Sequence, residues 1–228
     1  MKTIPIDWKN INTVFLDMDG TLLDLHFDNH FWLEHMPRRY AEKHNITLDK
    51  AREQLMTNYQ AHEGSLKWYC LDHWQETLQM DIVSLKHEVA DRIAIRANVI
   101  EFLDYLRTME KRIVLLTNAH HKTVKLKFGY ADIEHHFDRI ITAHDVGLAK
   151  EQTGFWQALQ KMENFNKQNS LFIDDNLDVL NTAQDYGVSY LLAIQQPDSQ
   201  QAMKDTGDFV AIECYTQLTG QVDFCHSR

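Results

Sequence analysis

The segment Asp17-Met18-Asp19-Gly20-Thr21 places two carboxylates directly after a short apolar run, residues 13–16. If that run is a buried strand of a parallel sheet, Asp17 and Asp19 lie at its carboxyl end, where such sheets bind ligands. Two carboxylates this close favour a hard, oxygen-seeking divalent cation. They can also divide the chemistry, one as an ionised nucleophile and the other as a proton donor with a raised pKa. A capped turn with two solvated acids is the alternative, and the context favours the functional interpretation.

A second pair of carboxylates, Asp174 and Asp175, follows another buried run, residues 171–173. Adjacent acids at a strand end are costly unless they are paired or bound to metal. Alternatively, Asn176 or Asp178 caps the following helix and the acids have no further role. Together with the first pair, Asp174 and Asp175 would complete an oxygen-ligand site for Mg²⁺.

Two further positions could bind phosphate. Thr117 and Asn118 follow the apolar residues 112–116, and a hydroxyl and backbone amides at a strand-to-helix turn suit phosphate oxygens. Lys150 precedes a predicted helix and could offset carboxylate repulsion and bind phosphate charge. Taken alone, the first motif is more often a plain helix cap, and a lone lysine is usually a solvated surface charge.

Charge and composition exclude several classes of partner. The 228 residues include 23 Lys and Arg against 33 Asp and Glu, a net charge of −10. Nucleic acids and anionic membrane surfaces need a basic patch, so we expect neither as the main partner. No run approaches the ~18 apolar residues of a membrane span. The first twenty residues meet carboxylates too early for a secretory signal. The three cysteines, Cys70, Cys214 and Cys225, are far apart and form no CxxC pair, so we expect a protein of the reducing cytoplasm.

Apolar runs alternate with helical patterns over most of the chain, which predicts an α/β fold with a Rossmann-like parallel sheet. Both faces of each predicted strand are apolar, as in a buried parallel sheet. The predicted strands are 13–16, 112–116, 139–142, 170–173 and 190–194, and the predicted core helices are 98–110, 121–130, 151–163 and 177–186.

Residues 26–95 interrupt this alternation, because their pattern is helical throughout. We therefore predict a core of residues 1–25 and 96–228, with a helical cap of residues 26–95 inserted after the first strand. The cap is rich in aromatic residues; one could stack on a purine ring, but we expect most to form the cap's own core. The predicted cap helices are 28–44, 48–62, 67–79 and 82–93.

Two regions receive no functional assignment. The tail, residues 198–228, has little pattern. The pairs His120-His121 and His135-His136 lack the helical spacing of a metal site and are interpreted as surface residues. His120 is a partial exception, because it follows the predicted phosphate-binding turn and could touch a ligand.

Taken together, the motifs resemble those of the haloacid dehalogenase-like hydrolases, and the helical insertion resembles the branch with a cap after the first motif. Further stretches resemble the bacterial GMP/IMP nucleotidases of that family, although Ala149 stands where those proteins commonly have proline. The motifs are Asp17-x-Asp19-Gly20-Thr21, Thr117-Asn118, Lys150 and Asp174-Asp175; the further stretches are 22–25, 27–29, 31–32, 68–72, 116–120 and 196–199.

The resemblance implies a Mg²⁺-dependent phosphatase. In that family Asp17 would attack phosphorus, and Asp19 would protonate the leaving oxygen and then activate water. Mg²⁺ would be bound by the Asp17 carboxylate, the Asp19 backbone carbonyl and Asp175, with Asp174 as support. Thr117, the Asn118 amide and Lys150 would bind the transferring phosphoryl group. The implied partner is a small phosphomonoester, a purine nucleoside 5′-monophosphate such as GMP or IMP, and the protein would be a monomer or homodimer.

Other functions remain open from the sequence. A sugar-phosphate or phosphoglycolate phosphatase, or a phosphomutase, would keep the fold and change the substrate. A phospho-acceptor signalling domain also clusters acids around an aspartate, but the long insertion argues against it. A metal-free dehalogenase would not need Asp19, and a degenerate binding protein would not need the complete set of catalytic residue types.

Overall fold

The centre of the molecule is a parallel sheet in the order β3-β2-β1-β4-β5-β6, seen in a computed structural model that describes residues 4–219. The five predicted strands are confirmed within one residue. The sixth, β6, lies in the tail to which the sequence assigned no pattern. The strands are β1 (Thr13–Leu16), β2 (Arg112–Thr117), β3 (Arg139–Thr142), β4 (Ser170–Asp174), β5 (Tyr190–Ile194) and β6 (Ala211–Ile212).

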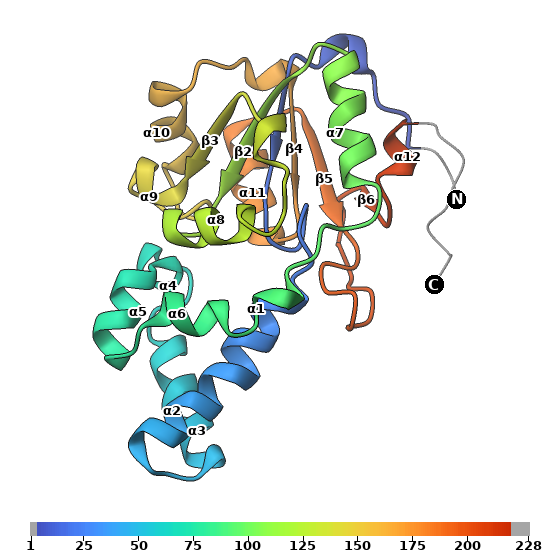
Figure 1. Cartoon of the computed structure of the whole chain (residues 1–228). Helices are drawn as coiled ribbons and strands as arrows, with labels where there is room; N and C mark the ends of the chain where they lie inside the picture. The colour runs from blue at the N-terminus through green and yellow to red at the C-terminus, as the bar shows by residue number, and fades with distance from the viewer. Residues whose placement is uncertain (1–3, 220–228) are drawn as a thin grey trace.

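Helices pack on both faces of this sheet (Figure 1). Successive residues of β1 alternate between the two layers: Val14 and Leu16 pack with α7, and Phe15 packs with Trp156 of α10. The buried strands therefore have no polar face, as the continuous apolar runs predict. The core helices are α7 (Val99–Thr108), α8 (His121–Phe128), α9 (Ala143–Val146), α10 (Phe155–Met162), α11 (Leu177–Tyr186) and α12 (Thr216–Thr219).

Between β1 and α7 the chain forms only helices and their connections, and Figure 1 shows this insert beyond one end of the strands. The insert has its own hydrophobic cluster, in which Phe27, Phe31, Tyr59 and Trp74 are buried. Half of its Phe, Trp and Tyr residues are thus fully buried, and Trp32, Tyr40 and Trp68 are partly buried and pack against the same cluster. Its helices are α1 (His26–His30), the π-helical η2 (Phe31–His35), α2 (Met36–His44), α3 (Leu48–Gln60), α4 (Leu66–Tyr69), α5 (Leu71–Leu78), α6 (Ile82–His87) and the 3₁₀ turn η3 (Ala90–Arg92).

Four predicted helices differ from the observed ones. The helix predicted at 82–93 ends at His87, and a separate 3₁₀ turn follows at residues 90–92. The helix predicted at 67–79 is interrupted at Cys70, whose backbone is extended, and the Trp74 indole donates to the Trp68 carbonyl across this break at 2.7 Å. The helix predicted at 151–163 begins only at Phe155, because Gly154 has a φ of +93° and cannot continue a helix. The helix predicted at 28–44 widens into a π-turn before Pro37, which has no amide to donate.

Leu23 forms bridges with Asp19 and with Ile95, so the two ends of the insert lie side by side at the base of the helical segment. The two segments that connect the insert to the sheet therefore lie next to each other. Among residues 4–219, no helix is both long and apolar enough to cross a bilayer.

Candidate active site

Lys150 is the centre of the site that the motifs predict. Its side chain is only 2 % exposed, and its ammonium donates to Asp17 at 2.5 Å, to Asp174 at 2.6 Å and to the Leu116 carbonyl at 3.1 Å. Burial lowers the pKa of Lys150, but the two carboxylates outweigh burial and raise that pKa above its ordinary value. A charged lysine therefore fixes Asp17, at the end of β1, against Asp174, at the end of β4.

Three carboxylates converge beside this lysine. One oxygen from each of Asp17, Asp174 and Asp175 lies within 4.8 Å of the others. Burial and the neighbouring carboxylates together raise the pKa of both Asp17 and Asp175 to about 6, although nearby lysines oppose the shift. A cation would relieve this repulsion, and the all-oxygen donor set fits Mg²⁺. The structure thus brings together the predicted metal ligands Asp17 and Asp175 and the predicted supporting residue Asp174.

Gly20 allows the loop after β1 to approach these acids. Its φ is +79°, and a β-carbon added there would lie 2.8 Å from Cγ of Asp175. A side chain at this position would collide with the Asp175 carboxylate and displace it. This steric conflict explains why the first motif has a glycine here.

Asp19 belongs to a second charged group, whose two lysines the sequence analysis missed. Its carboxylate accepts from Lys127 of α8, and Lys127 also donates to Asp28 of α1. Lys86 of α6 donates to Asp28 at 3.0 Å. Burial raises the pKa of Asp19 to about 6 although Lys127 opposes that shift. For Asp28, the two lysines overcome burial and lower the pKa to about 2.

The turn after β2 connects the site to the insert. The Asn118 side chain accepts from the Lys150 backbone amide at 2.8 Å and donates to Glu151 at 2.8 Å. Glu151 also accepts from the Tyr69 hydroxyl of α4 at 2.8 Å. Thr117 is buried, and its hydroxyl accepts from the Ala119 amide at 3.0 Å. Asn118 therefore contacts Lys150, and Thr117 lines the same cavity as Lys150.

A cavity of about 380 Å³ extends from the carboxylates into the insert. This volume is within the usual range for small-molecule sites. Its polar end is formed by the predicted residues Asp17, Asp19, Thr117, Asn118, Lys150, Asp174 and Asp175; its apolar end is formed by Trp32, Leu33, Met56, Tyr59, Trp68, Tyr69, Leu71 and Trp74. A ligand with one anionic and one flat apolar end would match both ends.

The interpretation of both histidine pairs as surface residues is wrong in part. His120 and His136 are buried, whereas His121 and His135 are exposed. His120 caps α8 and packs against His144 of α9, with ring centroids 4.7 Å apart. Burial lowers the pKa of His120 to about 4, so the ring is neutral at physiological pH. His120 is not among the described residues that line the cavity.

Comparison with known proteins gives a match over residues 11–187 to the model of the haloacid dehalogenase-like hydrolase family. The chain belongs to this family. It is therefore a hydrolase, and the motifs at the ends of β1, β2 and β4 and at Lys150 are those on which the resemblance rests.

Particular relatives give a finer comparison. The chain is 36% identical over 215 residues to the GMP/IMP nucleotidase YrfG of Escherichia coli, covering 94% of this chain and 97% of that protein. It is 24% identical to (S)-2-haloacid dehalogenase 2 of a Pseudomonas species, covering 74% and 77%. Among solved structures, the HAD phosphatase from Thermococcus onnurineus matches with a TM-score of 0.73 at 18% identity, covering 91% of this chain and 95% of that one. This last likeness confirms the fold.

Proposed function

We propose that this hydrolase is a Mg²⁺-dependent phosphatase that hydrolyses purine nucleoside 5′-monophosphates, with GMP and IMP as the preferred substrates. The observation that carries the proposal is the single cavity that joins the Asp17 and Lys150 cluster to an aromatic wall. The identity to a GMP/IMP nucleotidase over nearly the whole chain supports the choice of substrate.

Asp17 is the proposed nucleophile. Its carboxylate oxygen attacks phosphorus, the bond from phosphorus to the ribose 5′-oxygen breaks, and Asp17 carries the phosphoryl group. Bound Mg²⁺ would neutralise negative charge on the phosphoryl oxygens. The Asp17 and Asp175 carboxylates and the Asp19 backbone carbonyl would hold the ion, with Asp174 in support.

Asp19 is the proposed acid and base. In the first step its carboxylic acid gives a proton to the leaving ribose oxygen. In the second step its carboxylate accepts a proton from water, which attacks phosphorus and releases inorganic phosphate from Asp17. A pKa of about 6 suits both tasks, because the group holds and releases a proton near neutral pH.

Lys150, Thr117 and the Asn118 amide would bind the phosphoryl group. All three ammonium hydrogens of Lys150 already have acceptors: Asp17, Asp174 and the Leu116 carbonyl. Lys150 would therefore exchange or share one of these acceptors when a phosphoryl oxygen arrives. Its constant role in the proposal is to keep Asp17 ionised and oriented.

Residues 26–95 are the proposed cap, and their aromatic side chains are the proposed base-binding wall. Trp32 and Trp68 are partly exposed and border the cavity, so a purine ring could stack on either. Such a wall would give a nucleotide an advantage over a small phosphate ester such as phosphoglycolate. A cytoplasmic location and a monomeric or homodimeric state remain predictions from the sequence.

A substrate panel with saturating Mg²⁺ tests the proposal. It comprises purine and pyrimidine 5′-monophosphates, sugar phosphates and phosphoglycolate, with Asp17→Asn as the control for contaminating phosphatase. We expect the highest kcat/KM for GMP and IMP. A panel headed by phosphoglycolate or a sugar phosphate would instead assign the chain to the alternative phosphatases or phosphomutases of the same fold.

A further inference from the structure

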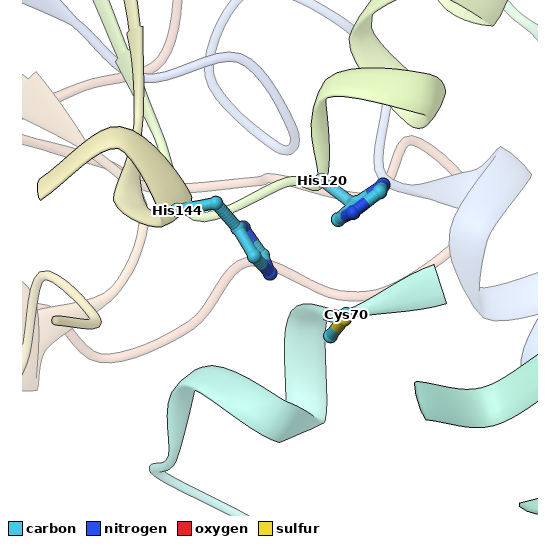
Figure 2. Close-up of side chains that lie close together, drawn as sticks. All are labelled: Cys70, His120 and His144. Atoms are coloured by element: carbon cyan, nitrogen blue, oxygen red, sulfur yellow. The ribbon is translucent and has the colours of Figure 1, made fainter. Parts of the chain in front are cut away.

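A second group of metal-binding side chains lies where the insert meets the sheet, outside the cavity. Figure 2 shows Cys70, His120 and His144 close together. One potential ligand atom from each lies within 4.8 Å of the other two. Cys70 joins α4 to α5 in the insert, whereas His120 precedes α8 and His144 lies in α9.

These side chains leave potential ligand atoms without a strong hydrogen bond. Both ring nitrogens of His144 are buried and have no hydrogen-bond partner among residues 4–219. Nδ1 of His120 accepts from the Lys122 amide at 3.4 Å as the cap of α8, and Nε2 lies 3.7 Å from an Asp72 oxygen, so Nε2 is the atom left for a ligand. Cys70 is a free, half-buried thiol. A ligand that accepts lone pairs would satisfy all three.

We propose that Cys70, His120 and His144 form a second cation site, specific for a borderline-soft divalent ion such as Zn²⁺. Thiolate and imidazole are the usual Zn²⁺ ligands, whereas the Asp17 cluster offers only the oxygen ligands that Mg²⁺ prefers. Three protein ligands leave a fourth position for water. On binding, the Cys70 thiol gives up its proton and its sulfur bonds to the ion.

The required rearrangement is small. In a tetrahedral site with Zn–S of about 2.3 Å and Zn–N of about 2.0–2.1 Å, ligand atoms lie about 3.3–3.6 Å apart. The observed group, with all atoms within 4.8 Å, needs a contraction of about 1 Å, which side-chain rotation can supply.

The ion would join the insert to the sheet. Two polar contacts already join the insert to the core near this site. Asp72 of the insert pairs with Lys122 of α8 at 2.5 Å, and Tyr69 of the insert donates to Glu151 at 2.8 Å. Cys70 is adjacent to Tyr69, and His120 is two residues from Asn118, so the proposed site lies next to residues that line the cavity. A bound Zn²⁺ would act as a latch that opposes separation of the insert from the sheet.

Cobalt provides a spectroscopic test of the site. One equivalent of Co²⁺ is added to the full chain in saturating Mg²⁺, and we expect a thiolate-to-cobalt charge-transfer band that Zn²⁺ abolishes. Cys70→Ser should lose the band, and His144→Ala should weaken Co²⁺ binding about tenfold or more. The exposed His135→Ala and the acidic-site variant Asp175→Asn are controls that should keep it. Circular dichroism verifies that each variant is folded.

Two results would overturn the site: no charge-transfer band in the wild type, or a band that survives in folded Cys70→Ser. The latch has its own readout, amide hydrogen exchange in residues 66–78. Zn²⁺ should slow this exchange at least several-fold in the wild type and leave Cys70→Ser unchanged. Equal exchange with and without bound Zn²⁺ would refute the latch. None of these measurements uses turnover, so their failure and a failure of the proposed function are distinguishable.

Discussion

Each of the buried lysines Lys150 and Lys127 lies between two carboxylates, and each holds one of the two aspartates of the first motif. Lys150 orients Asp17, and Lys127 contacts Asp19 together with Asp28 of the insert. The lysines therefore divide the motif into two electrostatic environments. In the proposed mechanism, this separation would let the neighbouring carboxylates take different roles.

Lys127→Met should impair Asp19 without unfolding the protein. Lys127 lowers the pKa of Asp19, so its loss should raise that pKa above about 6. Less Asp19 carboxylate would then be available to activate water, and the acidic limb of the kcat profile should move to higher pH. We expect a fall in kcat at neutral pH of about 10- to 100-fold, less than loss of the acid–base group itself. Lys125→Met, an exposed lysine of the same helix, is the matched control. An unchanged pH profile would remove Lys127 from this role.

Asp19→Asn should separate the two chemical steps. Asparagine neither protonates a leaving oxygen nor accepts a proton from water, so turnover should fall about 10²- to 10⁴-fold. An aryl phosphate needs little protonation of its leaving group and should still give a burst of about one equivalent before slow turnover. A nucleotide should give little burst. Rapid-mixing measurements would contradict the assignment if both substrates slow equally with no burst.

The sequence predicted the residues of the first group and Asp19 of the second, but not the lysines Lys127 and Lys86 that join Asp19 to Asp28. Asp17, Thr117, Lys150 and Asp174 follow strand ends or a strand connection, so local pattern places them at one edge of the sheet. Lys127, Lys86 and Asp28 reach Asp19 only through the packing of α8 against the insert, which no local pattern contains. A charged residue within the apolar stripe of α8 was the available signal.

At the scale of elements, loops and helix ends position the site more than helix interiors do. Strand ends and the turn at Gly20 are anchored by the sheet register, so their positions follow from the sequence pattern. The break at Cys70 depends on the contact between Trp74 and Trp68 within the folded insert, so a periodicity analysis predicts one continuous helix there. The burial of His120 was missed for a similar reason, since its ring packs against His144 of α9, which is distant in the sequence.

Glu163 ties α10 to the amino ends of two strands. It is buried and accepts from Arg112 at 2.7 Å and from Arg139 at 2.8 Å. Burial raises the pKa of Glu163, but the two arginines outweigh burial and lower that pKa below its ordinary value. The stabilisation that the ionised Glu163 carboxylate provides is therefore complete above the ordinary pKa of glutamate. It is lost as the pH falls through the lower pKa that Glu163 has in the folded protein.

Glu163→Gln should reduce the free energy of unfolding by about 1–2 kcal/mol at neutral pH, allowing for the partial exposure of both arginines. The difference from wild type should shrink as the pH falls below about 4, where glutamate begins to protonate. Urea unfolding at several pH values measures this difference in the free energy of unfolding. Glu101→Gln, a change at an exposed glutamate, is the control. A difference that is constant with pH would show that the ion pairs are not its source.

At the scale of the whole molecule, the chain combines an acidic net charge with a substrate that is itself anionic. The net charge is −10, and three carboxylates surround the site of phosphoryl transfer. Lys150 and Lys204 balance only part of this charge, so under the proposed function a divalent cation would neutralise the rest when a phosphate monoester binds.

Exhaustive chelation should therefore abolish turnover of GMP, and Mg²⁺ should restore it. Ca²⁺ should restore little, because it prefers more ligands at longer distances than a compact magnesium site provides. To test this metal dependence, the enzyme is dialysed against EDTA, each ion is added back separately, and GMP turnover is measured. Full activity in the chelated enzyme would exclude a role for the metal in turnover.

The central claim is that a purine nucleotide transfers its phosphoryl group to Asp17. Enzyme mixed with excess GMP and Mg²⁺ is quenched during turnover, treated with borohydride, which reduces an aspartyl phosphate to homoserine, and mapped by peptide mass spectrometry. The account predicts reduction at Asp17 in the wild type, dependent on GMP, and neither reduction nor turnover in Asp17→Asn. Modification at another residue, or GMP hydrolysis by Asp17→Asn at more than a few per cent of the wild-type rate, would contradict it.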